Sequence, residues 1–294
     1  MLNREGEDVM KWVESLFDSK IGPYRMPSMF PVKTNLFSKT VLESFSVGTS
    51  GQFAGVFSCG ISGNHSAYRI SSLNTGTAYD GAINYGAIHS ITSSTFSYRG
   101  GSALTSDLVT YADVIRLSSY HVKIKYIGRL DAASGVIRTG FNVNNDNYTH
   151  ALVTPSQMMD LDRYMESGPL DQCEVHWTPH DISCFEFLSG SSGSNNIYIF
   201  GSGFPPGETV EITIIANYEY IPRVSYGELL GSTTTEAPIV ESSKIGGVLS
   251  TISSAYKKFD GVSNIGTIAM HGVKELLKSY FPVVSNMTKP YIDY

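Results

Sequence analysis

Alternation of apolar and polar residues in two long runs constrains the fold more than any other feature of this sequence. Residues 114–127 read VIRLSSYHVKIKYI, and residues 209–221 read TVEITIIANYEYI. Successive side chains of a β-strand point to opposite faces, so each run predicts a strand with one buried face. The side chains of the second run that we expect in a core are Val210, Ile212, Ile214 and Ala216. Two such long runs predict an antiparallel β protein.

Shorter strand patterns occupy much of the rest of residues 35–222. We expect them at residues 40–47 (with Val41, Phe45 and Val47 on one face), 52–59, 135–142, 173–178, 184–188 and 196–201. A turn at Leu130–Ser134 lies between residues 114–127 and 135–142, which together predict a long hairpin. Roughly eight strands at these spacings, with no room for a parallel βαβ unit, predict an all-β sandwich or barrel.

Helical patterns are confined to a few segments. Pro155–Tyr164 predicts a short helix with Thr154 as its N-cap. The apolar residues Val9, Trp12, Val13, Leu16 and Phe17 predict an amphipathic helix over 7–17, docked either on its own domain or on a neighbouring subunit. Three prolines in Gly22–Pro31 then predict an extended arm. Helical periodicity returns over residues 239–281.

These patterns divide the chain into three parts. We expect an N-terminal helix and arm at 1–34, a β-sandwich at 35–222 and a C-terminal extension with helical segments at 223–294. Residues 60–110 are rich in Ser, Gly, Thr and Asn. Because a bare loop of that length is rare inside a compact domain, we expect a decorated insertion with short strands and one helical turn.

Composition and charge narrow the function classes. The net charge is −6 and no Lys/Arg run occurs, which argues against a basic nucleic-acid-binding domain. Charged residues make up only 16% of the 294 residues, which suits permanent contact with neighbouring subunits. No apolar run approaches a membrane span, and acidic residues stand where a signal peptide would be basic. Three cysteines, including Cys59, are too few for a disulfide framework, so we expect a soluble protein made in a reducing compartment.

Two groups of residues could hold a metal ion. Cys173, His176, His180 and Cys184 have the spacing C-x2-H-x3-H-x3-C, which could suit zinc. Because residues 173–177 read as a strand, Cys173 and His176 should diverge, and the alternative is buried cysteines with hydrogen-bonded histidines. Asp160 and Asp162 could bind calcium at a subunit boundary, although such pairs are common on solvated helices. We predict no metal or cofactor site from these residues.

Other short motifs carry little chemistry. Asn144–Asn147 is a turn by composition, and the sequons at Asn64, Asn147 and Asn286 should stay unmodified without a signal peptide. Neither a G-x-S-x-G nucleophile elbow nor a phosphate-binding loop is present. We therefore predict that the protein is not an enzyme.

Four stretches, taken in order, resemble the single jelly-roll coat proteins of the nodavirus-like and tombusvirus-like group, which includes the coats of diatom-infecting single-stranded DNA viruses. They are DSKIGPYRMPSMFPVKT (18–34), the 112–142 block, HWTPHDISCFEF (176–187) and GFPPGETVEITIIANYEYIP (203–222). The match covers about residues 35–222. It implies an eight-stranded antiparallel jelly roll of two four-stranded sheets, BIDG and CHEF, tapering to a wedge that packs around five-fold and quasi-six-fold axes.

The resemblance also implies a function and partners. The chain would self-assemble in many copies into an icosahedral T=3 shell inside the host cell and enclose the viral genome in the virion. Its further partners would be the viral nucleic acid, bound weakly or through a basic arm outside this chain, and a host receptor. Calcium at subunit interfaces would be the one ion expected.

Two departures from the family pattern matter, and one alternative stays open. The chain has no Arg/Lys-rich arm, and Asn264 and Asn286 are followed by Ile and Met, so no autoproteolytic site can be carried over. The alternative function is a carbohydrate-binding, lectin-like jelly roll, which shares the architecture and the aromatic composition. The helical ends favour the coat protein, because a lectin sandwich does not need them.

Overall fold

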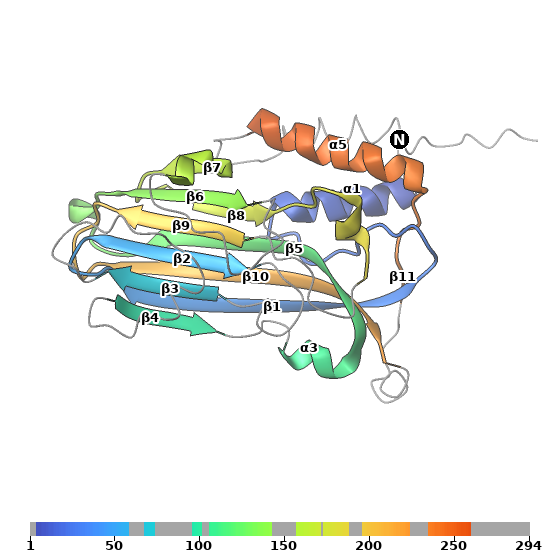
Figure 1. Cartoon of the computed structure of the whole chain (residues 1–294), viewed down its shortest axis with the longest axis horizontal. Helices are drawn as coiled ribbons and strands as arrows, with labels where there is room; N and C mark the ends of the chain where they lie inside the picture. Colours follow the sequence, from blue (N-terminus) through green and yellow to red (C-terminus); the bar gives the residue numbers. More distant parts are fainter. Residues whose placement is uncertain are drawn as a thin grey trace, which may run out of the picture.

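Two antiparallel sheets packed face to face form the body of the protein (Figure 1). The computed structural model describes residues 4–58, 68–73, 96–101, 106–142, 157–171, 173–187, 196–223 and 235–259. The strands are β1 (Lys33–Ser46), β2 (Gln52–Ser58), β3 (Tyr68–Leu73), β4 (Phe96–Gly101), β5 (Ala112–Tyr126), β6 (Val136–Asn142), β7 (Asp162–Ser167), β8 (Cys173–Trp177), β9 (Asn196–Ser202), β10 (Thr209–Pro222) and β11 (Thr235–Glu236). The helices are α1 (Arg4–Phe17), α3 (Ser106–Tyr111) and α5 (Ser242–Phe259), with short 3₁₀ turns η2 (Leu130–Ala132), η3 (Gln157–Asp160) and η4 (Ile182–Phe185).

The order of the strands is that of a viral jelly roll. One sheet runs β11-β1-β10-β5-β8 and the other runs β4-β3-β2-β9-β6-β7. With β3, β4 and β11 set aside, the remaining eight strands take the letters B to I in chain order. The first sheet then reads B-I-D-G and the second reads C-H-E-F. The predicted eight-stranded antiparallel jelly roll is confirmed, with β3, β4 and β11 as additions at the sheet edges.

Strand β10 lies near the middle of its sheet, and its apolar face fills the core. It pairs with β1 on one side and with β5 on the other. The predicted inward residues, Val210, Ile212, Ile214 and Ala216, all have zero exposure. On β1 the predicted face is also correct, because Phe45 is buried and Val41 packs against the core, while Leu42 is 59% exposed. The period of two therefore gave the right register in both strands.

The predicted hairpin between residues 114–127 and 135–142 is wrong. These segments become β5 and β6, which belong to different sheets. Both edges of β5 are occupied, one by β10 and the other by β8, so β6 cannot pair with it. The turn that contains η2 instead carries the chain from one sheet to the other.

Two shorter predictions are also wrong. In place of a helix over Pro155–Tyr164, the described part has the single turn η3, and the chain then enters β7, which pairs with β6. Thr154 and Pro155 lie outside the described residues. In place of a strand at 184–188, η4 forms, because the Asp181 carboxylate caps it by accepting from the Cys184 backbone N–H.

Helices lie near both ends of the described part of the chain, and three short elements lie at or next to residues 60–110, where the insertion stays a prediction. Strands β3 and β4 extend the second sheet, and α3 follows them. Helix α1 docks on its own domain, since Val9, Trp12, Val13 and Leu16 have zero exposure within the single chain. In Figure 1, α1 lies between the sandwich and α5, whose residues Ile245, Val248 and Ile252 belong to the same buried cluster. No helix among the described residues is long and apolar enough to cross a membrane.

Candidate functional site

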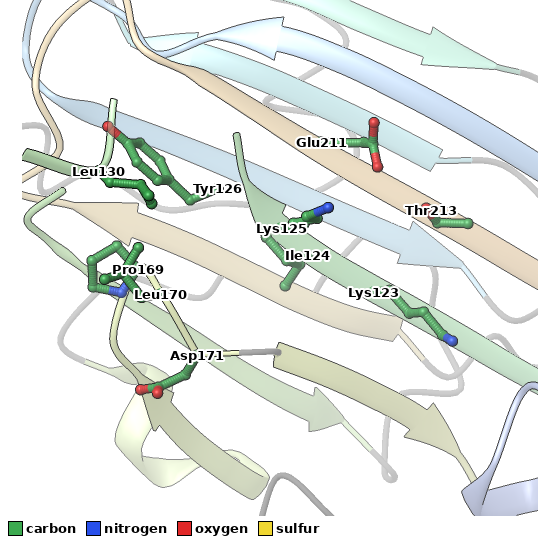
Figure 2. A pocket seen from close by; sticks show the side chains of 10 residues that line it. All are labelled: Lys123, Ile124, Lys125, Tyr126, Leu130, Pro169, Leu170, Asp171, Glu211 and Thr213. Atoms are coloured by element: carbon green, nitrogen blue, oxygen red, sulfur yellow. The ribbon is translucent and has the colours of Figure 1, made fainter. Parts of the chain in front are cut away.

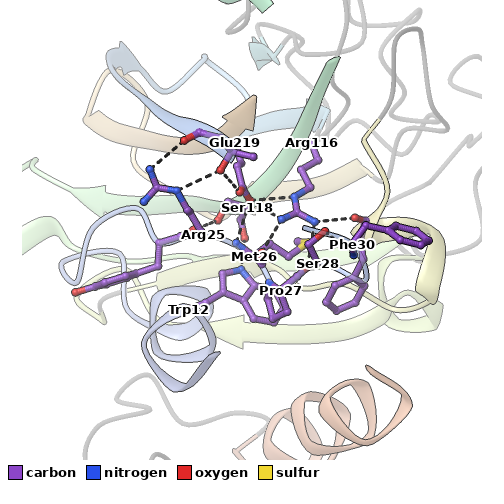
Figure 3. A network of polar contacts seen from close by, with 12 residues as sticks. Trp12, Arg25, Met26, Pro27, Ser28, Phe30, Arg116, Ser118 and Glu219 are labelled. Atoms are coloured by element: carbon purple, nitrogen blue, oxygen red, sulfur yellow. Dashed lines mark hydrogen bonds and ion pairs between the residues drawn. The ribbon is translucent and has the colours of Figure 1, made fainter. Parts of the chain in front are cut away.

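The end of the sandwich where β1 starts, here called the base, holds a buried ion pair (Figure 3). Arg116 on β5 and Glu219 on β10 are partners in register, and both side chains have zero exposure. The Nε and one terminal nitrogen of Arg116 donate to Glu219 Oε2 at 2.9 and 2.7 Å. Alternation places both residues on the face of the sheet opposite the core, so another segment must cover them.

That segment is the arm, residues 18–32, which runs from α1 to β1. The other N–H groups of Arg116 donate to the backbone carbonyls of Pro27 at 3.0 Å, Phe185 at 2.8 Å and Met26. All five donors of the guanidinium are thus used. Glu219 in turn accepts from the Met26 backbone N–H at 3.1 Å and from the Thr34 hydroxyl. The ion pair therefore fixes the backbone of the arm.

Further hydrogen bonds join the arm to both ends of the chain. The Ser118 hydroxyl donates to the Tyr24 carbonyl, and the Trp12 indole of α1 donates to the Ser118 carbonyl at 3.1 Å. On the other side, the Ser28 N–H donates to the Pro238 carbonyl and the Val240 N–H donates to the Ser28 carbonyl, both at 2.8 Å. The segments before β1 and after β11 thus meet at the base.

The electrostatics of this pair explain why it fixes the position of the arm. Burial lowers the pKa of the Arg116 guanidinium, while the charge and hydrogen bonds of Glu219 raise it in part. A buried charge is tolerated only when its partner and its hydrogen bonds are all in place. Since three of the acceptors for Arg116 are backbone carbonyls, two of them in the arm, the charge is satisfied only with the arm in this position.

The opposite end of the sandwich, here called the tip, consists of four turns at residues 47–51, 127–135, 168–171 and 203–208. The Val47 N–H donates to the Glu208 carbonyl at 2.7 Å, and the Phe204 N–H donates to the Gly51 carbonyl at 3.1 Å. Three apolar side chains of the tip are open to solvent: Leu130 at 76%, Leu170 at 64% and Ile127 at 43%. Exposed apolar side chains at one end of the sandwich make the tip a candidate surface for contact with another protein.

A groove of about 480 Å³ runs beside the tip on the outer face of the first sheet (Figure 2). Lys123, Lys125, Glu211 and Thr213 line it from the strands, and Leu130 and Leu170 line it from the tip. Its lining holds two lysines and, counting Asp171, two carboxylates. This balanced charge does not match a polyanion, because a groove that binds nucleic acid needs an excess of cations.

The structure does not bring the predicted zinc set together. Cys173 points into the sandwich core, where burial raises the pKa of its thiol to about 12. As expected from the strand, His176 points to the other face, beside His121 and Glu174. His180 Nδ1 lies 3.6 Å from Cys184 Sγ, and burial raises the pKa of that thiol to about 11. The four residues are thus divided among three places.

The two residues of the predicted calcium pair lie where η3 leads into β7. Asp160 ends η3 in an exposed position, and Asp162 begins β7. The groups of potential ligands among the described residues are His121 with Glu174 and His176, and His180 with Asp181 and Cys184, so Asp160 belongs to neither group. Calcium at a subunit boundary stays a prediction. Asn144–Asn147, Asn64, Asn286 and Cys59 lie outside the described residues.

Sequence reasoning missed both the buried ion pair and the groups around His121. The sequence held only half of the signal, because Glu219 lies on the polar face of its run whereas Arg116 shares the parity of the apolar Val122 and Ile124. A register shift between β5 and β10 at Asn217 and Tyr218 turns Arg116 to the outer face. The register that joins them, and the arm that covers them, are properties of the fold.

Comparison with solved structures finds a similar fold in proteins of virus particles. The fold is similar to that of infectious bursal disease virus VP2 in a subviral particle, with a TM-score of 0.57 and 11% identity over 85% of this chain and 94% of that one. It is also similar to a chain of the T13 particle of that virus, with a TM-score of 0.53 and 11% identity over 94% and 97% of the two chains. The fold is that of a viral coat protein. At this identity the likeness shows the fold alone, and it confirms the predicted viral jelly roll.

A third solved structure, that of the Gt strain of the same virus, is also similar, with a TM-score of 0.56 and 10% identity over 85% of this chain and 96% of that one. Comparisons by sequence identify no relative, since no family model and no curated protein matches the chain.

Proposed function

We propose that this chain is a structural capsid subunit that self-assembles into an icosahedral, T=3 shell around a viral genome. The observation that carries the proposal is the pair of sheets in the order B-I-D-G and C-H-E-F, in a fold similar to that of infectious bursal disease virus VP2 in a subviral particle. The role is one of assembly, and no step of catalysis is assigned to any residue.

The surface chemistry of the two ends supports this role. The tip exposes Leu130, Leu170 and Ile127, which a second copy of the same chain would cover in a ring of subunits. The low share of charged residues, 16%, favours contacts between uncharged surfaces. We place the tip around the five-fold and quasi-six-fold axes, as the wedge of jelly-roll coats implies.

The chain ends complete the proposed subunit. We propose residues 35–222 as the shell domain, with 1–34 and 223–294 as extensions on the inner surface of the shell. The net charge of −6 favours weak contact with the genome, or contact through a basic arm outside this chain.

The test is the size of the purified full chain, because assembly and monomeric binding differ by orders of magnitude in mass. Size-exclusion chromatography with light scattering, followed by negative-stain microscopy, should show megadalton particles of uniform diameter. A monomer or small oligomer under every salt and pH condition tried, with binding to a glycan array, would instead establish the lectin-like alternative.

A further inference from the structure

A cluster of polar side chains lies buried beneath the last turn of α1. His121 comes from β5, and Glu174 and His176 come from the neighbouring β8, with the two histidines paired in register. The side chains of His121, His176 and Glu174 are 0%, 6% and 15% exposed. The Phe17 ring of α1 packs edge-on against His176, with 6.3 Å between ring centroids.

Three potential ligand atoms in this cluster lie close to one another. His121 Nδ1 lies 3.1 Å from His176 Nδ1 and 3.3 Å from Glu174 Oε1, and His176 Nδ1 lies 3.7 Å from the same oxygen. In a tetrahedral zinc site with bonds of about 2.0–2.1 Å, neighbouring ligand atoms stand about 3.3 Å apart. The three distances in the cluster are close to the edges of that tetrahedron.

The hydrogen bonds around His121 determine which of its ring nitrogens faces the cluster. His121 Nε2 lies 2.9 Å from the Ser15 carbonyl oxygen, which can only accept, so Nε2 carries the ring proton. Nδ1 of the same ring therefore faces the cluster. Glu174 Oε1 is a buried oxygen with no hydrogen-bond partner of good geometry, and His121 Nδ1 and His176 Nδ1 lie 3.3 and 3.7 Å from it.

The surroundings of the cluster also suit a metal site. Histidines that bind a metal usually donate their other ring N–H to a backbone carbonyl or a carboxylate, as His121 does to Ser15. The second oxygen of Glu174 lies 3.5 Å from Lys123 Nζ, which orients the carboxylate. Two imidazoles and one carboxylate form a ligand set that zinc accepts, with water as a fourth ligand.

We propose that His121, His176 and Glu174 bind one Zn²⁺ ion, and that this ion fixes the end of α1 to β5 and β8. The link to the helix is the hydrogen bond between His121 and Ser15, which holds only while the His121 ring keeps this orientation. This proposal concerns one chain and is independent of capsid assembly.

The second group of potential ligands serves as a control. His180 Nε2 lies 3.2 Å from Asp181 Oδ2, whereas His180 Nδ1 lies 3.6 Å from Cys184 Sγ. Opposite nitrogens of one ring thus face the two partners, and a single ion cannot bind both through that ring. Zinc binding should therefore not depend on Cys184.

The test measures zinc binding to the full chain after removal of metal with a chelator. Isothermal titration should show one Zn²⁺ per chain, and zinc should raise the melting temperature. Glu174→Gln keeps the shape of the side chain and removes one ligand, so its affinity should fall at least about tenfold. Cys184→Ser should bind as tightly as the parent chain. Circular dichroism of each variant verifies that it is folded.

The absorption spectrum of the Co²⁺-bound parent chain tests the proposed ligands without any variant. Co²⁺ in the proposed site should give the visible absorption of a four-coordinate ion with no thiolate charge-transfer band. Absence of zinc binding, undiminished binding by Glu174→Gln, or a thiolate band from Cys184 would each overturn the proposal.

Discussion

At the base of the sandwich a fully charged pair is completely buried, whereas at the tip Leu130 and Leu170 lie largely in solvent. Charged side chains are usually exposed and apolar ones buried. The base departs from this rule with a buried charged pair, and the tip departs from it with exposed leucines. At the base, the arm, η4 and β1 supply the partners that Arg116 and Glu219 need besides each other. Among the described residues, none covers Leu130 and Leu170 in this way. The described part of one chain thus completes its base, and we propose that other copies cover its tip.

The largest expected effect comes from the core that both ends share. Ile212 is fully buried on β10, so Ile212→Asp places an unpaired carboxylate between the two sheets. Burying such a charge costs several kcal/mol, of the order of the whole stability of a domain, about 5–15 kcal/mol. We expect no soluble folded protein and no particles.

The matched control for this change is Thr213→Ser, the next residue along β10 and on the opposite face. It should fold and assemble like the parent chain. Soluble yield and circular dichroism measure both variants. If Ile212→Asp assembled normally, the register of β10 would be wrong, and the positions of Glu219 and of the base would have to be revised.

The next effect, at the base, is smaller. Glu219→Gln keeps the size of the side chain but leaves the Arg116 charge buried without its counter-ion, which should lower the free energy of unfolding by about 3–5 kcal/mol. The arm should also become sensitive to protease, because the amide of Gln has only one acceptor oxygen, so either the Met26 N–H or the Thr34 hydroxyl loses its acceptor. Urea unfolding and limited proteolysis measure the two effects.

The matched control is Glu211→Gln, on the same strand and in the groove near the tip. A change at such a partly exposed site should cost about 0.5 kcal/mol or less. Equal losses for the two variants would show that the buried pair does not stabilise the base more than an ordinary surface charge does.

The sequence predicts those features of the two ends that depend on residues close together along the chain, and it misses those that depend on distant residues. The core face of β10 was predictable, because alternation is local and one buried face determines it. The burial of Arg116 was not, since it depends on the arm, about ninety residues away. The wrong hairpin has the same origin, because only the pairing of β5 with β10 and β8 excludes β6.

The metal ligands show the same limit more sharply. Spacing along the chain suggested Cys173, His176, His180 and Cys184, but a strand sends neighbours to opposite faces. The partners that His176 does meet include His121, which is 55 residues away and becomes adjacent only through the pairing of β5 with β8. Local spacing therefore could not find this group.

Changes at the tip should have the smallest effect on the stability of the subunit. The same changes should nevertheless prevent particle formation. In Leu130→Asp/Leu170→Asp the new carboxylates replace side chains that are 76% and 64% exposed, so the free energy of unfolding of the dissociated subunit should change by about 0.5 kcal/mol or less. In a ring of subunits, however, these carboxylates would be buried next to one another, and like charges placed together are strongly unfavourable. The double variant should therefore stay a folded monomer or small oligomer in light scattering.

The control is Ile182→Asp, which changes a 45% exposed apolar residue on η4, away from the tip, and this variant should still form particles. Normal particles from the double variant would mean that the tip is not a contact between copies, and that its apolar residues must have another partner.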